Sequence, residues 1–233
     1  MATELQCGIF INKIASIAQK KCSGKIPPSV CIAQACCESA YGTSPKMKNA
    51  NAVFGIKVGK GKAKFGNAWK GKAYSTKTKE CYDGTTYTEI TDMFRAYDSL
   101  EESVQDYIDM LTVLVRYSDA IGETDPEKCI TAIKKGGYAT SPTYVSTIMS
   151  IIKKFNLTQY DKEPRKTVKI GSTGNDVKEL QELLQNKGYY IGESGSDGAF
   201  GINTQRAVVA FQFENGLDVD GKVGKKTWAK LED

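Results

Sequence analysis

The 233-residue sequence contains no histidine. This absence excludes catalysis by a Ser–His or Cys–His pair and every metal site that needs an imidazole ligand. Any chemistry must therefore depend on carboxylates, tyrosine, lysine or cysteine. The sequence also lacks an apolar run of the roughly 18 to 20 residues that a membrane span needs, so we expect no membrane association.

We expect no export signal in the first residues. Polar side chains at Glu4, Gln6 and Asn12 interrupt the region where a signal peptide would keep its apolar core. The apolar residues of this region fall at helical spacing, so we expect an amphipathic helix. The seven cysteines are odd in number and lack the regular spacing of a disulfide framework. Reduced thiols, and folding in the cytosol, are therefore expected.

A polar stretch with a proline, DKEPRKTVK, separates two regions of different character. We predict one domain over residues 1–160, a linker over 161–167 and a second domain over 168–233. The whole chain has a formal net charge of +5, yet residues 166–233 carry nine basic and ten acidic side chains. The basic excess therefore belongs to the first domain.

The first domain is predicted to be mainly helical, with one extended lobe. Pro28 opens a helix that Gly42 can end. Between residues 53 and 97, glycines, threonines and aromatic residues alternate over short distances. This pattern indicates a β-hairpin, and Asp83 followed by Gly84 is typical of its turn.

The second domain contains an internal repeat. The string DGAFGINT begins at Asp197, and DGKVGKKT begins 23 residues later at Asp220. Each copy predicts a tight glycine turn followed by a short helix, and an amphipathic helix precedes the first copy. The stretch DVDG does not match a calcium loop, because Gly216 stands where the first acid should be and Thr227 where the last glutamate should be,. No metal site is expected.

The stretch CIAQACCESAYG places three cysteines and one carboxylate in an apolar run. A helix that is apolar on every side is buried, and free cysteine in such a helix behaves as a small hydrophobic residue. The spacing C-x4-CC lacks the paired C-x-x-C of a metal clamp, and no histidine is present to activate a thiol. We therefore interpret these thiols as packing.

Glu38 is the single charge in that stretch. Burial should raise the pKa of its carboxyl group, and a glutamate that stays protonated near neutral pH is what a general acid in glycoside hydrolysis requires. The alternative is that Glu38 lies near the helix end and points to water. Such hydrolysis usually needs a second carboxylate, and periodicity does not choose among the candidates in the hairpin region: Glu80, Asp83, Glu89 and Asp92.

Five ordered motifs resemble one family of enzymes. CIAQACCESAYGTS, NAVFGIK, AWKGKAYSTKTKECYDG, FRAYDSLEESVQDY and GYATSPTY, over about residues 5–157, are similar to glycoside hydrolase family 73, the bacterial endo-β-N-acetylglucosaminidases of peptidoglycan. The second domain resembles a peptidoglycan-binding domain of the three-helix type. The resemblance implies a mainly α protein: a lysozyme-like helical catalytic domain with a β-hairpin lobe, and a small three-helix wall-binding domain.

The resemblance also assigns catalytic roles. It implies that Glu38, in the AQ-x-x-x-ES motif, is the general acid. It matches Glu80 to the second glutamate of the family, which lies on a mobile hairpin. The role of that glutamate is debated: it activates water, or the substrate's own acetamido group assists instead. Tyr138, in the GYAT motif, is implied to lie close to the reacting sugar. No cofactor is implied.

Four aromatic residues are candidates for substrate binding. Ala40-Tyr41 stands where the family often has Gly-Trp, and Tyr41 can stack on a sugar or pack. Phe54 can belong to the groove floor or to the core, and Trp69 can stack on a sugar or cap the hairpin. Tyr144, next to the GYAT motif, is the fourth candidate.

These features together predict an enzyme that cleaves the β-1,4 bond between N-acetylglucosamine and N-acetylmuramic acid. The alternatives are a muramidase or lytic transglycosylase on the same fold, and a non-catalytic wall-binding protein. The expected partners are peptidoglycan glycan strands, with the second domain as the wall anchor. Attraction to an anionic wall explains the lysine-rich run after Ile56 more simply than nucleic acid does. We expect a monomeric phage-type endolysin, made in the cytosol and released through holin pores.

Overall fold

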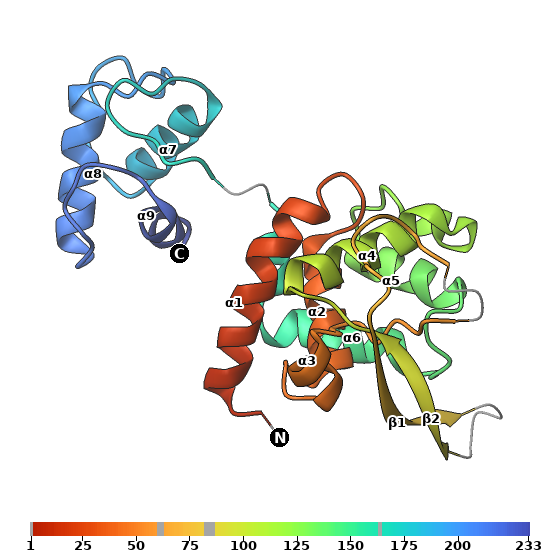
Figure 1. Ribbon diagram of the computed structural model, residues 1–233. Helices are drawn as coiled ribbons and strands as arrows, with labels where there is room; N and C mark the ends of the chain where they lie inside the picture. Colours follow the sequence, from red (N-terminus) through yellow and green to blue (C-terminus); the bar gives the residue numbers. More distant parts are fainter. Residues whose placement is uncertain (1, 60–62, 82–86, 163–164) are drawn as a thin grey trace. The chain divides into compact units, whose positions relative to one another are not determined.

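The computed structural model describes residues 2–59, 63–81, 87–162 and 165–233 (Figure 1). The chain divides into two compact units, Met1–Glu163 and Pro164–Asp233. Each unit has its own hydrophobic core.

The first unit is mainly helical with one two-stranded antiparallel sheet among its described residues. Its elements in chain order are α1 (Glu4–Lys21), α2 (Pro28–Ser39), α3 (Pro45–Ala50), β1 (Ala73–Cys81), β2 (Tyr87–Arg95), α4 (Leu100–Val113), the 3₁₀ helix η2 (Val115–Ala120), α5 (Pro126–Lys135), α6 (Tyr144–Lys154) and the 3₁₀ helix η3 (Leu157–Tyr160). The predicted fold class is confirmed. Figure 1 shows the hairpin β1–β2 extending away from the helical body. The predicted turn at Asp83 and Gly84 lies outside the described residues.

Helix α2 forms the centre of the first unit. Most of its side chains are buried, and it contacts α1, α5, α6 and η3. Pro28 stands at the first helical position, where its fixed φ suits the helix and its missing N–H costs nothing,. The apolar sequence of this segment is thus explained by packing on all sides.

A residue from far along the chain caps the start of α2. The Asp161 carboxylate accepts hydrogen bonds from the Ser29 backbone N–H at 2.6 Å and from the Ser29 hydroxyl at 2.7 Å. It thereby satisfies one of the backbone donors that a helix N-terminus leaves without a partner. Asp161 is therefore part of the first unit, although the sequence places it at the start of a linker.

The other end of the predicted linker belongs to the second unit. The Arg165 guanidinium donates to Glu179 and to Glu232 and lies 4.4 Å from the ring centroid of Trp228. The indole N–H of Trp228 donates to the Lys166 carbonyl oxygen at 3.1 Å. The segment that neither unit holds is therefore shorter than the predicted 161–167.

The base of the hairpin is anchored by a buried ion pair. Arg95, the last residue of β2, donates from one guanidinium nitrogen to both carboxylate oxygens of Asp106 at 3.0 Å. Both side chains are 1% exposed or less, and the Tyr97 hydroxyl donates to the same carboxylate at 2.7 Å. The guanidinium carbon lies 4.3 Å from the ring centroids of both Phe65 and Trp69. This cluster ties β2 to α4.

The second unit contains three α-helices among its described residues: α7 (Asn175–Asn186), α8 (Ile202–Glu214) and α9 (Lys225–Glu232). Val177, Leu180 and Leu184 of α7 are fully buried in its core. The predicted three-helix arrangement is therefore confirmed.

The sequence repeat is also a structural repeat, because each copy is held by a glutamine of the preceding helix. The Gln181 amide donates to Asp197 at 2.8 Å and to Thr204 at 3.2 Å, and its oxygen accepts from the Gly198 N–H. In the second copy, Gln212 makes the same three contacts. Its amide donates to Asp220 and to Thr227, and its oxygen accepts from the Gly221 N–H. The aspartates of the repeat therefore have a structural function in the turns.

The described residues include no helix that combines the length and the apolar character needed to cross a lipid bilayer.

Candidate active site

Glu38 lies in the last turn of α2, one residue before the helix ends at Ser39. The sequence predicts that Gly42 ends this helix, but the left-handed backbone begins earlier, with φ of 50° at Ala40 and 54° at Tyr41. Gly42 has another function. A Cβ atom at this position would lie 2.5 Å from the Phe10 ring, so only glycine allows the turn to approach α1 so closely,.

The Glu38 carboxyl group is half-buried, and it does not simply point to water. Burial raises its pKa above the ordinary glutamate value, and two weaker effects oppose that change: a hydrogen bond from Tyr144 and the positive charge of Lys46. The hydroxyl of Tyr144 donates to Glu38 Oε1 at 2.9 Å. Desolvation thus favours the protonated acid, while the hydrogen bond fixes its orientation.

A relay of hydrogen bonds supports that orientation. The Tyr107 hydroxyl donates to the side-chain oxygen of Gln34, and the Gln34 amide donates to the Tyr144 hydroxyl at 2.9 Å. Tyr144 then donates to Glu38. Burial raises the pKa of both phenols, so they remain protonated and keep these donor roles. The relay joins three helices to one carboxylate.

An aromatic cluster packs beside the relay. The rings of Phe54 and Tyr107 stack with centroids 4.0 Å apart, and Tyr138 lies 6.0 Å from both Tyr107 and Tyr144. The Tyr138 hydroxyl donates to the Phe54 carbonyl oxygen at 3.3 Å. Tyr138, a predicted catalytic residue, is therefore brought next to Tyr144, and it is half-buried.

Lys46, on α3, faces the same site. Its ammonium nitrogen lies 4.3 Å from the centroid of the Phe94 ring at the end of β2. Its charge is the one that lowers the pKa of Glu38. Lys46 thus interacts both with the base of the hairpin and with the candidate acid.

Three of the four predicted sugar-binding aromatics are buried: Phe54, Trp69 and Tyr144. Phe54 is 4% exposed and belongs to the core, and Trp69 is 1% exposed with its indole N–H donating to the Lys72 carbonyl oxygen at 2.6 Å. For Phe54 and Trp69, the sequence left a packing role and a sugar-binding role open, and this placement agrees with the packing role. Tyr41 is half-buried and packs edge-on against Phe155, with centroids 5.7 Å apart. Tyr144 contacts Glu38.

Glu80 lies on β1, in register with Thr88 of β2. Its side chain is outside the described part of the structure, so its role as the second carboxylate stays a prediction. Two other candidates for that role pair with lysines across or beside the hairpin: Asp92 with Lys57 at 2.9 Å, and Glu89 with Lys77 at 2.8 Å.

The cysteines of α2 are free thiols. Burial raises the pKa of Cys36 to about 12 and that of Cys37 to about 11. A thiol with a raised pKa carries little thiolate at neutral pH and is a weak nucleophile. The packing interpretation of these residues agrees with this environment.

Sequence reasoning missed Gln34 and Tyr107. A signal for the first was available, because Gln34 precedes Glu38 by four residues and so lies on the same helix face. No local signal marks Tyr107, which is 73 residues from Gln34.

The site can hold an oriented carboxylic acid beside aromatic side chains, which suits proton donation to a sugar oxygen. The described residues contain no group of three or more histidine, cysteine or acidic side chains that could bind a metal ion. An oriented, half-buried carboxyl group of this kind is able to act as a general acid.

Comparison with known proteins gives an independent view of both units. The model of the Glucosaminidase family, described as mannosyl-glycoprotein endo-beta-N-acetylglucosaminidase, matches residues 13–157. A peptidoglycan binding domain model matches residues 173–231.

Two curated relatives match about two thirds of the chain. The chain is 31% identical over 150 residues to the peptidoglycan hydrolase FlgJ of Vibrio parahaemolyticus, covering 62% of this chain and 46% of that protein. It is 31% identical over 159 residues to the exo-glucosaminidase LytG of Bacillus subtilis, covering 66% of this chain and 53% of that protein. The chain thus spans about half the length of these relatives.

A solved structure matches over nearly its whole length. The catalytic domain of the autolysin Auto from Listeria monocytogenes is 30% identical with a TM-score of 0.57, and the match covers 69% of this chain and 90% of that one.

Proposed function

The chain belongs to the Glucosaminidase family, glycoside hydrolase family 73, and on that premise we propose that it hydrolyses the β-1,4 bond between N-acetylglucosamine and N-acetylmuramic acid in peptidoglycan. One observation carries the proposal: the half-buried Glu38 carboxyl, whose pKa burial raises and whose orientation Tyr144 fixes at 2.9 Å. The FlgJ relatives are named peptidoglycan hydrolases, which supports the choice of polymer.

In the proposed reaction, Glu38 transfers its proton to the glycosidic oxygen as the bond from that oxygen to the anomeric carbon breaks. Water adds to the anomeric carbon and loses a proton, so that one sugar leaves with a new reducing end. Glu80 is proposed to take that proton, or to stabilise the positive charge on the sugar, when the hairpin brings it to the substrate. Tyr138 is proposed to pack against the reacting sugar.

Reducing-end analysis of digested wall tests this assignment. We expect N-acetylglucosamine at the new reducing ends and a rapid fall in mean strand length, as internal cleavage requires. N-acetylmuramic acid ends would indicate a muramidase, and anhydro ends a lytic transglycosylase. Since LytG is named an exo-glucosaminidase, release of sugars only from strand ends would contradict the endo-acting part of the proposal.

The proposal extends to the place of action. We propose that the second unit holds the enzyme on the wall and that the protein acts as a monomeric, bacteriolytic phage endolysin that holin pores release from the cytosol. The match to a peptidoglycan binding domain over residues 173–231 supports the anchoring role. The free thiols at Cys22 and Cys31 support folding in a reducing compartment,.

The Tyr144→Phe variant tests how the acid is tuned. The Tyr144 hydrogen bond stabilises the ionised carboxylate and lowers the pKa of Glu38, so its removal should raise that pKa. A general acid works only while it is protonated, so kcat/KM falls as the pH rises through its pKa. We therefore expect this descending limb to move to higher pH in the variant, and the maximal rate to fall because the carboxyl loses its fixed orientation.

Tyr138→Phe is the matched comparison, because the Tyr138 hydroxyl donates to the Phe54 carbonyl and not to Glu38. Its descending limb should stay at the wild-type pH even if its rate changes. A Tyr144→Phe profile that only decreases in height, with no shift along the pH axis, would remove Tyr144 from the tuning of the acid.

A further inference from the structure

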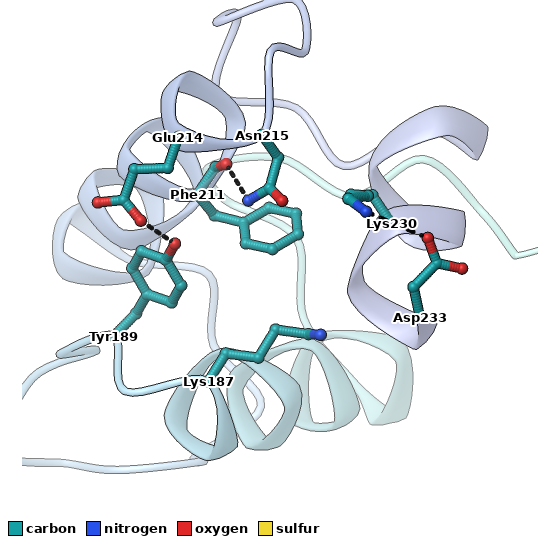
Figure 2. A pocket seen from close by; sticks show the side chains of 7 residues that line it. All are labelled: Lys187, Tyr189, Phe211, Glu214, Asn215, Lys230 and Asp233. Atoms are coloured by element: carbon teal, nitrogen blue, oxygen red, sulfur yellow. Dashed lines mark hydrogen bonds and ion pairs between the residues drawn. The ribbon is translucent and has the colours of Figure 1, made fainter.

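A cavity of about 450 Å³ lies in the second unit, between the ends of its three helices (Figure 2). It has the size of a small-ligand site. The residues that line it are Lys187, Tyr189, Phe211, Glu214, Asn215, Lys230 and Asp233.

The three helices all end at this cavity. Lys187 is the C-cap of α7, Asn215 is the C-cap of α8, and Asp233 is the C-cap of α9. Helix C-termini carry partial negative charge, so three of them together form a place that favours a cation. Glu214, the last residue of α8, adds a full negative charge at a position that the helix dipole disfavours,.

The acidic side of the cavity is held in place. The Tyr189 hydroxyl donates to Glu214, and the Lys230 ammonium nitrogen lies 3.3 Å from the Asp233 carboxylate. The Phe211 ring, which is 2% exposed, stacks edge-on against Tyr189 with centroids 5.7 Å apart and forms an apolar floor. Figure 2 shows Tyr189 and Glu214 on one side of the cavity and the α9 pair on the other.

Lys187 supplies the opposite charge. Figure 2 shows its side chain reaching across the cavity, with no interaction drawn to the other lining residues. Its side chain is exposed, so its ammonium group can pair with an anion of a ligand. The cavity thus offers a carboxylate and an ammonium group on either side of an aromatic floor.

We infer that this cavity binds the peptide stems of peptidoglycan, with Glu214 receiving the ammonium group of the diamino acid and Lys187 a carboxylate of the same stem. The sugars of the glycan strand, with the lactyl acid of N-acetylmuramic acid amide-linked to the stem, carry no charge that could pair with either group, whereas a stem peptide carries charges of both signs. The inference rests on the proposed wall-binding function, which it makes specific. Peptide recognition would hold the enzyme to the wall without occupying the glycan strand that the first unit cleaves.

Titration of the full-length chain with free L-alanyl-γ-D-glutamyl-L-lysine, followed by ¹⁵N-HSQC spectra, tests the inference. We expect shifts at the amides of Lys187 and Asn215, and about two- to fivefold weaker binding when the lysine ε-amino group of the peptide is acetylated, the usual size of one exposed ion pair. Glu214→Gln should weaken the binding of the free peptide by a similar factor and leave the binding of the acetylated peptide unchanged. Glutamine can still accept the Tyr189 hydrogen bond, so the fold is kept.

Matched variants lie in the same unit, outside the cavity. Glu193→Gln and Lys178→Gln make the same charge changes at exposed positions, and both should bind the free peptide as the wild type does. Lys187→Gln should weaken the binding of the free and the acetylated peptide by the same factor. Equal losses in Lys178→Gln and Lys187→Gln would overturn the inference, because they would show general charge attraction.

A sugar probe separates the two components of the wall. Chitotetraose, titrated in the Glu38→Gln background so that it is not consumed, should leave the amides of Lys187 and Asn215 unshifted. Shifts there with the sugar and none with the peptide would overturn the inference. The reducing-end assay reads the first unit alone, so failure of peptide binding and failure of the proposed hydrolysis are distinguishable.

Discussion

Replacing Glu38 with glutamine is expected to lower the rate of wall hydrolysis by about a hundredfold or more, the usual contribution of a general acid. Glutamine keeps the shape of the side chain and can still accept the hydrogen bond from Tyr144. It has no acidic proton for the glycosidic oxygen. The loss should therefore appear in kcat, with little change in how the protein binds to intact sacculi.

Turbidity loss of purified sacculi measures the rate, and sedimentation of the protein with the sacculi measures binding. Glu127→Gln is the matched control, since Glu127 is an exposed glutamate in the first turn of α5. It should hydrolyse wall at the wild-type rate. Wild-type hydrolysis by Glu38→Gln would remove Glu38 from the chemistry, whereas binding without hydrolysis by the unsubstituted protein would make this unit a wall-binding scaffold.

The environment of Glu38 was predictable because the signal is local. An apolar segment with one carboxylate predicts a buried helix and a carboxyl group with a raised pKa, and α2 has both features. The hairpin was predictable for a similar reason, since β1 and β2 pair in register from Ala73 and Arg95 onward. Patterns of spacing along a few residues carry this information.

The partners of Glu38 were not predictable from any local pattern. The relay depends on contacts across 73, 110 and 106 residues of sequence, and only the packing of α2, α4 and α6 brings these side chains together. The left-handed residues that end α2 were missed because glycine is the usual residue there. Trp69 illustrates the same limit: its burial depends on Arg95, 26 residues further along the chain.

The largest structural effect is expected for Asp106→Asn. Asp106 and Arg95 form a buried ion pair, and removing one charge leaves the other buried without compensation. Loss of one partner from such a pair typically costs about 3–5 kcal/mol of unfolding free energy. Asparagine preserves the side-chain volume, so the loss of unfolding free energy will come from the missing charge and not from a cavity.

The two tryptophans of the chain report the two units separately, because Trp69 is buried in the first unit and Trp228 in the second. With 5-fluorotryptophan labelling, denaturant titration followed by ¹⁹F NMR should show the Trp69 transition at a lower midpoint in Asp106→Asn and the Trp228 transition unmoved. Glu89→Gln, which breaks an exposed pair with Lys77 in the same hairpin, should cost no more than about 1 kcal/mol. If both variants unfolded at the wild-type midpoint of Trp69, the buried pair would not be what anchors β2 to α4, and the hairpin that carries Glu80 would depend on other contacts for its position.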